Sequence, residues 1–119
     1  MLFRSLKVYG IPNCDTVKKA TVWLKNKGIA YEFHDYKKLG ISQAKLEEWL
    51  TQVPWETLVN LKSTTFKDLS DKDKSQIIDN ASAIDLMLEK TSVIKRPIVE
   101  ADKVLAVGFK AEEYEVIFG

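Results

Sequence analysis

Hydrophobic and polar residues alternate in two short segments near the start of the chain. One alternation covers residues 6–9 and the other covers residues 29–34. Between them, residues 17–24 carry apolar or small side chains at helical spacing, with Asn13 placed to cap the helix and Gly28 to end it. Strand, helix and strand with short connections predict a βαβ unit, whose strands are parallel and joined by a right-handed crossover.

The middle of the chain predicts helices. Ser42 is expected to cap one helix, which Pro54 ends while starting a further helical turn. A polar stretch follows over residues 62–65. Ser70 and Ser82 each precede an aspartate by three residues, an acidic variant of the capping box, so each is expected to begin a short helix.

The last part of the chain returns to strand patterns. Residues 97–99 and 104–107 are β-rich and flank a polar turn, which predicts a hairpin with Pro97 at its first strand position. Residues 111–118 predict a closing helix. The order βαβ, helices, ββα indicates an α/β fold with one mixed four-stranded sheet, helices on its faces and a helical insertion.

Composition narrows the class of protein. A chain of 119 residues with 45% hydrophobic residues predicts one globular domain, and a net charge of +1 gives no reason to expect nucleic acid or membrane as a partner. One cysteine and one histidine cannot supply an internal disulfide, a C-x-x-C pair or a thiolate zinc site, so we expect no metal. The N-terminal MLFRSLKVYG lacks the apolar core of a signal peptide, which predicts a cytoplasmic protein.

Cys14 is the first candidate for chemistry. It lies at the predicted start of the first helix, where free N–H groups and the helix dipole favour a thiolate. Lys18, one turn further on, adds a cation on the same side of the helix. An inert buried cysteine is the alternative interpretation, and position alone does not decide between the two.

Two further candidates carry weaker signals. Arg96 directly precedes the third predicted strand and could bring a fixed cation to an anion, although the residues alone favour a solvated arginine there. Because only about 5–6% of X-Pro bonds in folded proteins are cis, the sequence favours a trans bond before Pro97. His34 could act as a base, but a surface or half-buried histidine is the favoured interpretation. The glycines form neither G-x-G-x-x-G nor a P-loop, and no serine lies in G-x-S-x-G.

Four blocks of the sequence together resemble the arsenate reductase-related (ArsC/Spx) family, and within it the YffB-like branch of small single-cysteine proteins. The blocks are Y-G-I-P-N-C-D-T-V-K-K-A, P-W-E-T-L-V-N-L-K-S-T-T-F, K-R-P-I-V and A-V-G-F-K. The resemblance implies a thioredoxin-like (glutaredoxin-like) fold in a single domain, 1–119. Its thioredoxin-like parts would span about 1–38 and 92–119, around a helical insertion over about 40–91.

The resemblance also implies a chemistry and a site. In such a fold the bond before Pro97 is cis and Arg96 lies beside Cys14, whose thiolate attacks an oxyanion or accepts glutathione. We therefore expect a thiol-dependent oxidoreductase, with Cys14 and Arg96 as catalytic residues. The residues expected to bind substrate or glutathione are Asn13, Asp15, Lys18, Lys62, Arg96 and Pro97.

Departures from the arsenate reductase pattern leave two alternatives open. Lys18 and Lys62 stand where that pattern has arginines, and its late arginine falls at Phe109 or Lys110, so arsenate reduction is one alternative. The other is an Spx-like regulator that binds the RNA polymerase α C-terminal domain, although C-D-T-V lacks the second cysteine of a redox switch. We expect a monomer without bound cofactor, with glutathione or a similar thiol as co-substrate and glutaredoxin as a possible protein partner.

Overall fold

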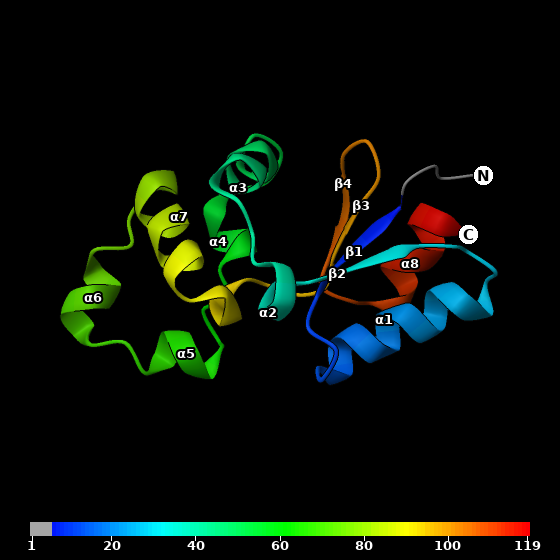
Figure 1. The fold of residues 1–119 in the computed structure, drawn as a ribbon, viewed down its shortest axis with the longest axis horizontal. Helices are drawn as coiled ribbons and strands as arrows, with labels where there is room; N and C mark the ends of the chain where they lie inside the picture. Colours follow the sequence, from blue (N-terminus) through cyan, green and yellow to red (C-terminus); the bar gives the residue numbers. More distant parts are fainter. Residues whose placement is uncertain (1–5) are drawn as a thin grey trace. The chain divides into compact units, whose positions relative to one another are not determined.

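The computed structural model describes residues 6–119. The first five residues of the N-terminal segment considered above lie outside this range. The chain divides into two compact units (Figure 1). The sheet unit comprises the residues up to Leu39 together with Arg96–Gly119, and the helical unit comprises Gly40–Lys95.

The sheet unit contains a mixed four-stranded sheet, which confirms the predicted α/β class. Its strand order is β2 (Glu32–Asp35), β1 (Lys7–Gly10), β3 (Ile98–Glu100) and β4 (Val104–Val107). β1 is parallel to β2 and antiparallel to β3, and β3 and β4 form the predicted antiparallel hairpin. The sheet therefore joins the two ends of the chain through the pairing of β1 with β3.

Helices α1 (Asp15–Asn26) and α8 (Ala111–Phe118) pack on one face of this sheet. The apolar positions predicted for the first helix are buried in the structure, since Val17, Ala20 and Leu24 are each at most 2% exposed. This burial removes apolar surface from water and is the main force that holds the layers together. The buried core of this face consists of Leu6, Val8, Ala20, Leu24, Val99, Ala106 and Tyr114.

The predicted start of the first helix and the predicted start of the following strand were wrong, whereas the predicted end of the helix at Gly28 is confirmed. Cys14, in an extended conformation, is the N-cap residue in place of Asn13, so the helix begins one residue later than expected. At the other end Gly28 adopts a left-handed conformation, with φ of 72°, and the Ile29 N–H donates to the Leu24 carbonyl oxygen at 2.9 Å. This Schellman motif uses Ile29, the first residue that alternation had assigned to the strand, and β2 begins only at Glu32.

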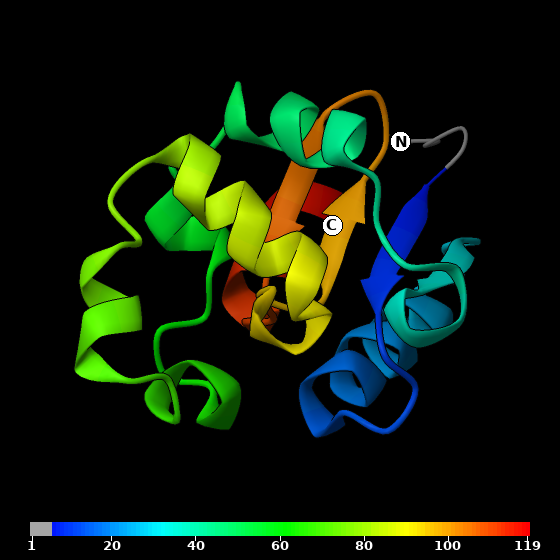
Figure 2. The same cartoon turned by 60° about the vertical axis from the view of Figure 1, so that its left-hand side comes forward.

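The helical unit consists of short helices (Figure 2). The predicted cap is confirmed, because the Ser42 side chain accepts a hydrogen bond from the Lys45 N–H at 3.1 Å. Helices α3 and α7 contact each other, and Val59 pairs with Ile94 in an isolated bridge. The helices of this unit are α3 (Gln43–Leu50), α4 (Trp55–Leu58), α5 (Thr64–Lys67), α6 (Asp71–Ser75), α7 (Asn80–Glu89) and the 3-10 helix η1 (Thr91–Val93).

Three expectations in this unit are settled by the capping residues. Ser70 caps α6 as predicted. Ser82 does not begin a helix: Asp79 is the N-cap of α7, and Ser82 completes a reciprocal capping box with it. The polar stretch over residues 62–65 contains the start of α5, which Ser63 caps by accepting from the Phe66 N–H at 3.1 Å.

Helix α2 (Tyr36–Leu39) is one turn long and follows β2 directly within the sheet unit. Asp35, the last residue of β2, is 9% exposed, and its Oδ1 accepts a hydrogen bond from the Lys37 N–H at 2.8 Å. This contact fixes the turn from strand to helix. Across residues 6–119, no helix combines the length and the apolar character that a membrane crossing requires.

Candidate active site

Strand register brings two distant segments to the same edge of the sheet. Because β1 and β3 are antiparallel, with Tyr9 opposite Ile98, the end of β1 lies beside the start of β3. The loop after β1 leads to Cys14, and Arg96 and Pro97 lead directly into β3. The pairing of two strands therefore places Cys14 and Arg96 at one site.

Gly10 makes this close approach possible. A Cβ atom at Gly10 would lie 2.8 Å from Cγ2 of Val17 in α1 and 3.8 Å from Cβ of Arg96. The first distance is shorter than side-chain contacts allow, so the strand end requires glycine for reasons of space. The first turn of α1 and the Arg96 side chain can consequently both pack against the end of β1.

Cys14 occupies the N-cap position of α1, and its thiol is partly exposed. Partial burial raises the pKa of the Cys14 thiol, but the backbone N–H of Val17, the Arg96 side chain and the N–H of Thr16 outweigh it, so that the pKa is lowered. The sulfur does not adopt the geometry of a full capping hydrogen bond, so we attribute the N–H contribution to dipoles directed at the sulfur. This environment favours the thiolate, the nucleophilic form of cysteine.

Arg96 is the cation that acts on this thiol. Its half-buried side chain lowers the pKa of the Cys14 thiol both through its N–H donors and through its positive charge. The Arg96–Pro97 peptide bond is cis, as the family resemblance implied and contrary to the expectation from the residues alone. Pro97 is buried, and its carbonyl oxygen accepts a hydrogen bond from the Gly108 N–H at 2.7 Å.

The other expected binding residues are arranged less closely around the sulfur. Asn13 and Asp15 flank Cys14 in the chain, and both side chains are exposed. Lys18 is exposed one turn along α1, and its N–H donates to the Cys14 carbonyl oxygen at 3.0 Å. Lys62 belongs to the helical unit, where its N–H donates to Oδ1 of Asn60 at 3.1 Å, so it is not part of the site that the sheet unit forms by itself.

Comparison with known proteins establishes the family. The model of the ArsC family matches residues 9–117, which is nearly the whole chain. The chain belongs to the ArsC family. Among curated relatives, an uncharacterized protein of Haemophilus influenzae is 40% identical over 95% of this chain and 98% of its own length. The global transcriptional regulator Spx of Streptococcus agalactiae is 28% identical over 86% of this chain and 74% of its own length.

Solved structures agree with this assignment to the ArsC family. A YFFB protein is 41% identical, with a TM-score of 0.90, over 97% of this chain and 100% of that chain. An arsenate reductase (ArsC) related protein from Brucella melitensis is 49% identical, with a TM-score of 0.78, over 97% of this chain and 95% of that chain. The resemblance to YffB-like and Spx-related proteins expected from the sequence is confirmed, and so is the thioredoxin-like fold class.

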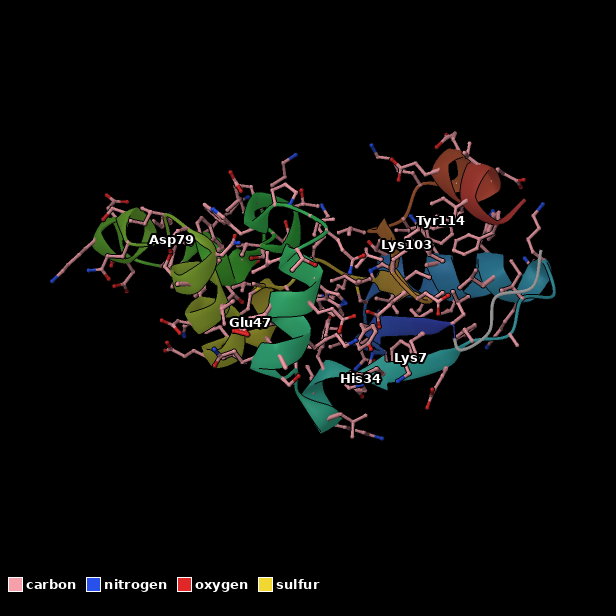
Figure 3. The ribbon with its side chains drawn as sticks, turned by 90° about the horizontal axis from the view of Figure 1, so that it is seen from above. Lys7, His34, Glu47, Asp79, Lys103 and Tyr114 are labelled. Atoms are coloured by element: carbon pink, nitrogen blue, oxygen red, sulfur yellow. The ribbon has the colours of Figure 1, made fainter. Side chains whose placement is uncertain are left out.

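This ArsC-family chain also contains a polar cluster that the sequence did not reveal. The Tyr9 hydroxyl donates to Oε2 of Glu100 at 3.0 Å, and the ring centroids of Tyr9 and His34 are 4.8 Å apart. Tyr36, at the start of α2, also lies against this group, with its ring centroid 6.3 Å from that of Tyr9. Figure 3 shows Lys7 and His34 on the neighbouring strands β1 and β2, and Tyr114 on α8. The alternation of Val8 and Tyr9 in the sequence indicates that Tyr9 faces away from Val8. It does not identify Glu100 and His34 as neighbours of Tyr9, because these depend on the strand register.

The chemistry that the described residues support is that of a thiolate. No group of three or more histidine, cysteine, aspartate or glutamate side chains within residues 6–119 could hold a metal ion. A partly exposed sulfur with a lowered pKa and an adjacent guanidinium suits attack on a disulfide or an oxyanion. A guanidinium carries several N–H donors that an anion can accept.

Proposed function

We propose that this protein is a thiol-dependent oxidoreductase that uses Cys14 as nucleophile and glutathione as the external thiol. The observation that carries the proposal is the position of the Cys14 sulfur. It lies at the start of α1 beside Arg96, and its pKa is lowered. A cysteine in such an electropositive, partly exposed position is typical of reactive thiols.

The proposed reaction proceeds in two thiol–disulfide exchanges. The Cys14 thiolate attacks the glutathione sulfur of a mixed disulfide, which forms a Cys14–glutathione disulfide and releases the substrate as a thiolate that takes up a proton. The thiolate of a second glutathione then attacks that disulfide, which yields glutathione disulfide and restores the Cys14 thiolate. The substrate is reduced by two electrons, and two glutathione units are joined by oxidation.

The sequence requires the second sulfur to come from outside, because Cys14 is its sole cysteine. Arg96 binds a carboxylate of glutathione or the anionic substrate, and Lys18 adds positive charge at the same end of α1. The N–H groups of Cys14 and Asp15 hold the attacked group. Asn13, Pro97 and Lys62 remain proposed contacts of the bound thiol.

The first test measures the thiol itself. The rate of alkylation against pH should give an apparent pKa below that of the same thiol in unfolded protein. Turnover of a mixed disulfide between glutathione and a small thiol should require Cys14, with Cys14→Ser as the inactive control. An ordinary or raised thiol pKa in the folded protein, or turnover that survives in Cys14→Ser, would exclude the proposal.

A second test locates the bound thiol. Titration with reduced glutathione, followed by backbone amide NMR on Cys14→Ser to avoid covalent reaction, should shift the signals of residues around position 14 and of Arg96. The signals of the helical turn at Ser70 serve as an internal reference. Absence of any shift at millimolar glutathione would remove glutathione as the co-substrate.

Arsenate reduction is a second candidate, favoured by the 49% identity to an arsenate reductase (ArsC) related protein. The substitution of arginines by lysines at positions 18 and 62 argues against it, because lysine binds an oxyanion without the planar fork of arginine. A coupled assay with arsenate, glutathione and glutaredoxin decides between the two. Turnover of arsenate that depends on Cys14 would favour this candidate.

A third candidate is a regulator without catalytic activity, favoured by the similarity to Spx over 86% of the chain. This chain lacks a second cysteine, so a disulfide switch within one chain is impossible. Pull-down with the C-terminal domain of the RNA polymerase α subunit tests the regulator. Binding that is unaffected in Cys14→Ser, together with no glutathione-dependent turnover, would favour it over the enzyme.

A further inference from the structure

The sheet face opposite α1 and α8 carries the polar cluster described above. Val8 and Val99 point into the apolar core, so their strand neighbours Tyr9 and Glu100 face the other side. Tyr9 and Glu100 are only 3% and 4% exposed, and the hydrogen bond between them is buried. The thiol chemistry proposed for Cys14 makes no direct use of this pair.

Tyr36 is the unusual member of the cluster. It is 2% exposed, and its ring centroid lies 6.3 Å from that of Tyr9 and 6.2 Å from that of His34. Among residues 6–119, no group forms a hydrogen bond with its hydroxyl oxygen. Because a buried hydroxyl without a partner costs stability, such a group calls for an explanation in function.

Charges of opposite sign act on this hydroxyl. Burial is the main reason that the pKa of Tyr36 is raised well above its ordinary value; Tyr9 and Glu100 also raise it, whereas Arg96 lowers it. The strand register places the two residues near each other, because Gly10 of β1 lies opposite Asp35, which precedes Tyr36, and a Cβ atom at Gly10 would lie 3.8 Å from Cβ of Arg96. The same Arg96 side chain lowers the pKa of the Cys14 thiol. The Arg96 guanidinium thus lowers the pKa of both the buried Tyr36 hydroxyl and the Cys14 thiol.

We propose that Tyr36 is a positioning residue whose hydroxyl oxygen accepts a hydrogen bond from the Arg96 guanidinium and holds it toward Cys14 during the reaction. A guanidinium has five N–H donors, so it can serve a sulfur, a substrate anion and a hydroxyl together. A neutral acceptor suits this position because a carboxylate would neutralise the charge that favours the thiolate. The inference rests on the proposed role of Cys14 and Arg96.

The test removes one oxygen atom. In Tyr36→Phe, alkylation of Cys14 at neutral pH and the kcat/KM for glutathione-dependent turnover should both fall about threefold to tenfold, the effect of losing one hydrogen bond. Tyr114→Phe is the matched control, because that buried hydroxyl donates to the Gly108 carbonyl oxygen on α8's side of the sheet. Its alkylation profile should equal that of the wild type.

A double-mutant comparison tests whether Tyr36 acts through Arg96. In an Arg96→Gln background, Tyr36→Phe should have no further effect on alkylation, because the group it positions is absent. An undiminished effect in that background would overturn the proposal. The proposal would also be overturned if Tyr36→Phe were more stable than the wild type and had the same alkylation profile. The buried hydroxyl would then only destabilise the fold and have no effect on Cys14.

A measurement without substitution of Tyr36 covers the case in which that variant fails to fold. Rotation of the Arg96 guanidinium, followed by side-chain NMR, should become restricted when reduced glutathione is added to Cys14→Ser, because Tyr36 then holds it. Free rotation in the glutathione-bound protein would overturn the role of Tyr36. If wild-type Cys14 alkylates as an ordinary thiol, the proposed function fails together with this inference; if only the Tyr36 measurements fail, the proposed function stands.

Discussion

The Arg96 side chain lowers the pKa of the Cys14 thiol, although the two residues lie near opposite ends of the chain. Cys14 begins α1 directly after β1, and Arg96 precedes β3, the antiparallel neighbour of β1. The pairing of β1 with β3 thus positions the Arg96 charge that favours the Cys14 thiolate. Changes at either residue should therefore be measurable at the sulfur.

Replacement of Arg96 should make Cys14 less reactive. Arg96→Gln removes the guanidinium, whose N–H donors and positive charge lower the pKa of the thiol, so that pKa should rise and alkylation at neutral pH should fall about tenfold. Arg96→Lys should lose less, because it retains the charge without the planar fork. Alkylation rates against pH measure both variants.

Lys103→Gln is the control for this series. Lys103 is an exposed cation in the turn of the β3–β4 hairpin, so the substitution changes net charge by the same amount in the same unit. Its alkylation profile should match the wild type. An equal effect of Lys103→Gln and Arg96→Gln would show that net charge, and not the contact with Cys14, sets the reactivity.

The lowered pKa of Cys14 should also appear in the pH dependence of stability. A thiol with a lower pKa in the folded than in the unfolded protein stabilises the fold fully above its unfolded pKa, and this contribution is lost as the pH falls through the folded pKa. Urea unfolding of the wild type, compared with Cys14→Ser, should therefore show a difference that grows from pH 7 to pH 10. A difference that shrinks over this range would mean that the sign of the shift is wrong.

Gly10→Ala should disturb both stability and reactivity. The added Cβ would lie 2.8 Å from Cγ2 of Val17, so the protein should lose roughly 1–3 kcal/mol of unfolding free energy. The start of α1 should shift away from Arg96, so alkylation of Cys14 should slow. In the double variant Gly10→Ala/Val17→Ala the overlap is removed, and alkylation should recover; continued slow alkylation would point to another cause.

The capping box of α7 predicts an order of stability among three variants. Oδ1 of Asp79 accepts from the Ser82 N–H at 2.9 Å and from its hydroxyl at 2.8 Å, and these contacts lower the pKa of Asp79. Asp79→Ala should lower the melting temperature more than Asp79→Asn, which keeps an acceptor. Asp85→Ala, an exposed position within α7, is the control.

The pH dependence provides a further check on this box. Because the pKa of Asp79 is lower in the folded protein, its contribution is present above the unfolded pKa and is lost as the pH falls through the folded value. The difference in melting temperature between wild type and Asp79→Asn should therefore decrease toward acidic pH. A constant difference would contradict a role for the charged form.

Several elements were predictable because local interactions determine them. The buried positions Val17, Ala20 and Leu24 follow from helical spacing, and Ser42 and Ser70 are caps whose hydrogen bonds lie within one turn. Asn13 and Ser82 misled the prediction because more than one residue near each helix start could serve as the cap. The choice was made by backbone conformation, extended at Cys14 and at Asp79.

The sequence by itself determined the order of elements, the family and the single reactive-cysteine candidate, because spacing, capping and motif residues are local properties. The family resemblance implied that Arg96 lies beside Cys14, but only the tertiary structure shows that the antiparallel register of β1 and β3 brings them together and places Tyr9 beside Glu100. The unpartnered hydroxyl of Tyr36 is likewise invisible in a sequence. Which side chains contact each other depends on strand pairing and burial across the whole sheet unit, and no local sequence pattern determines these.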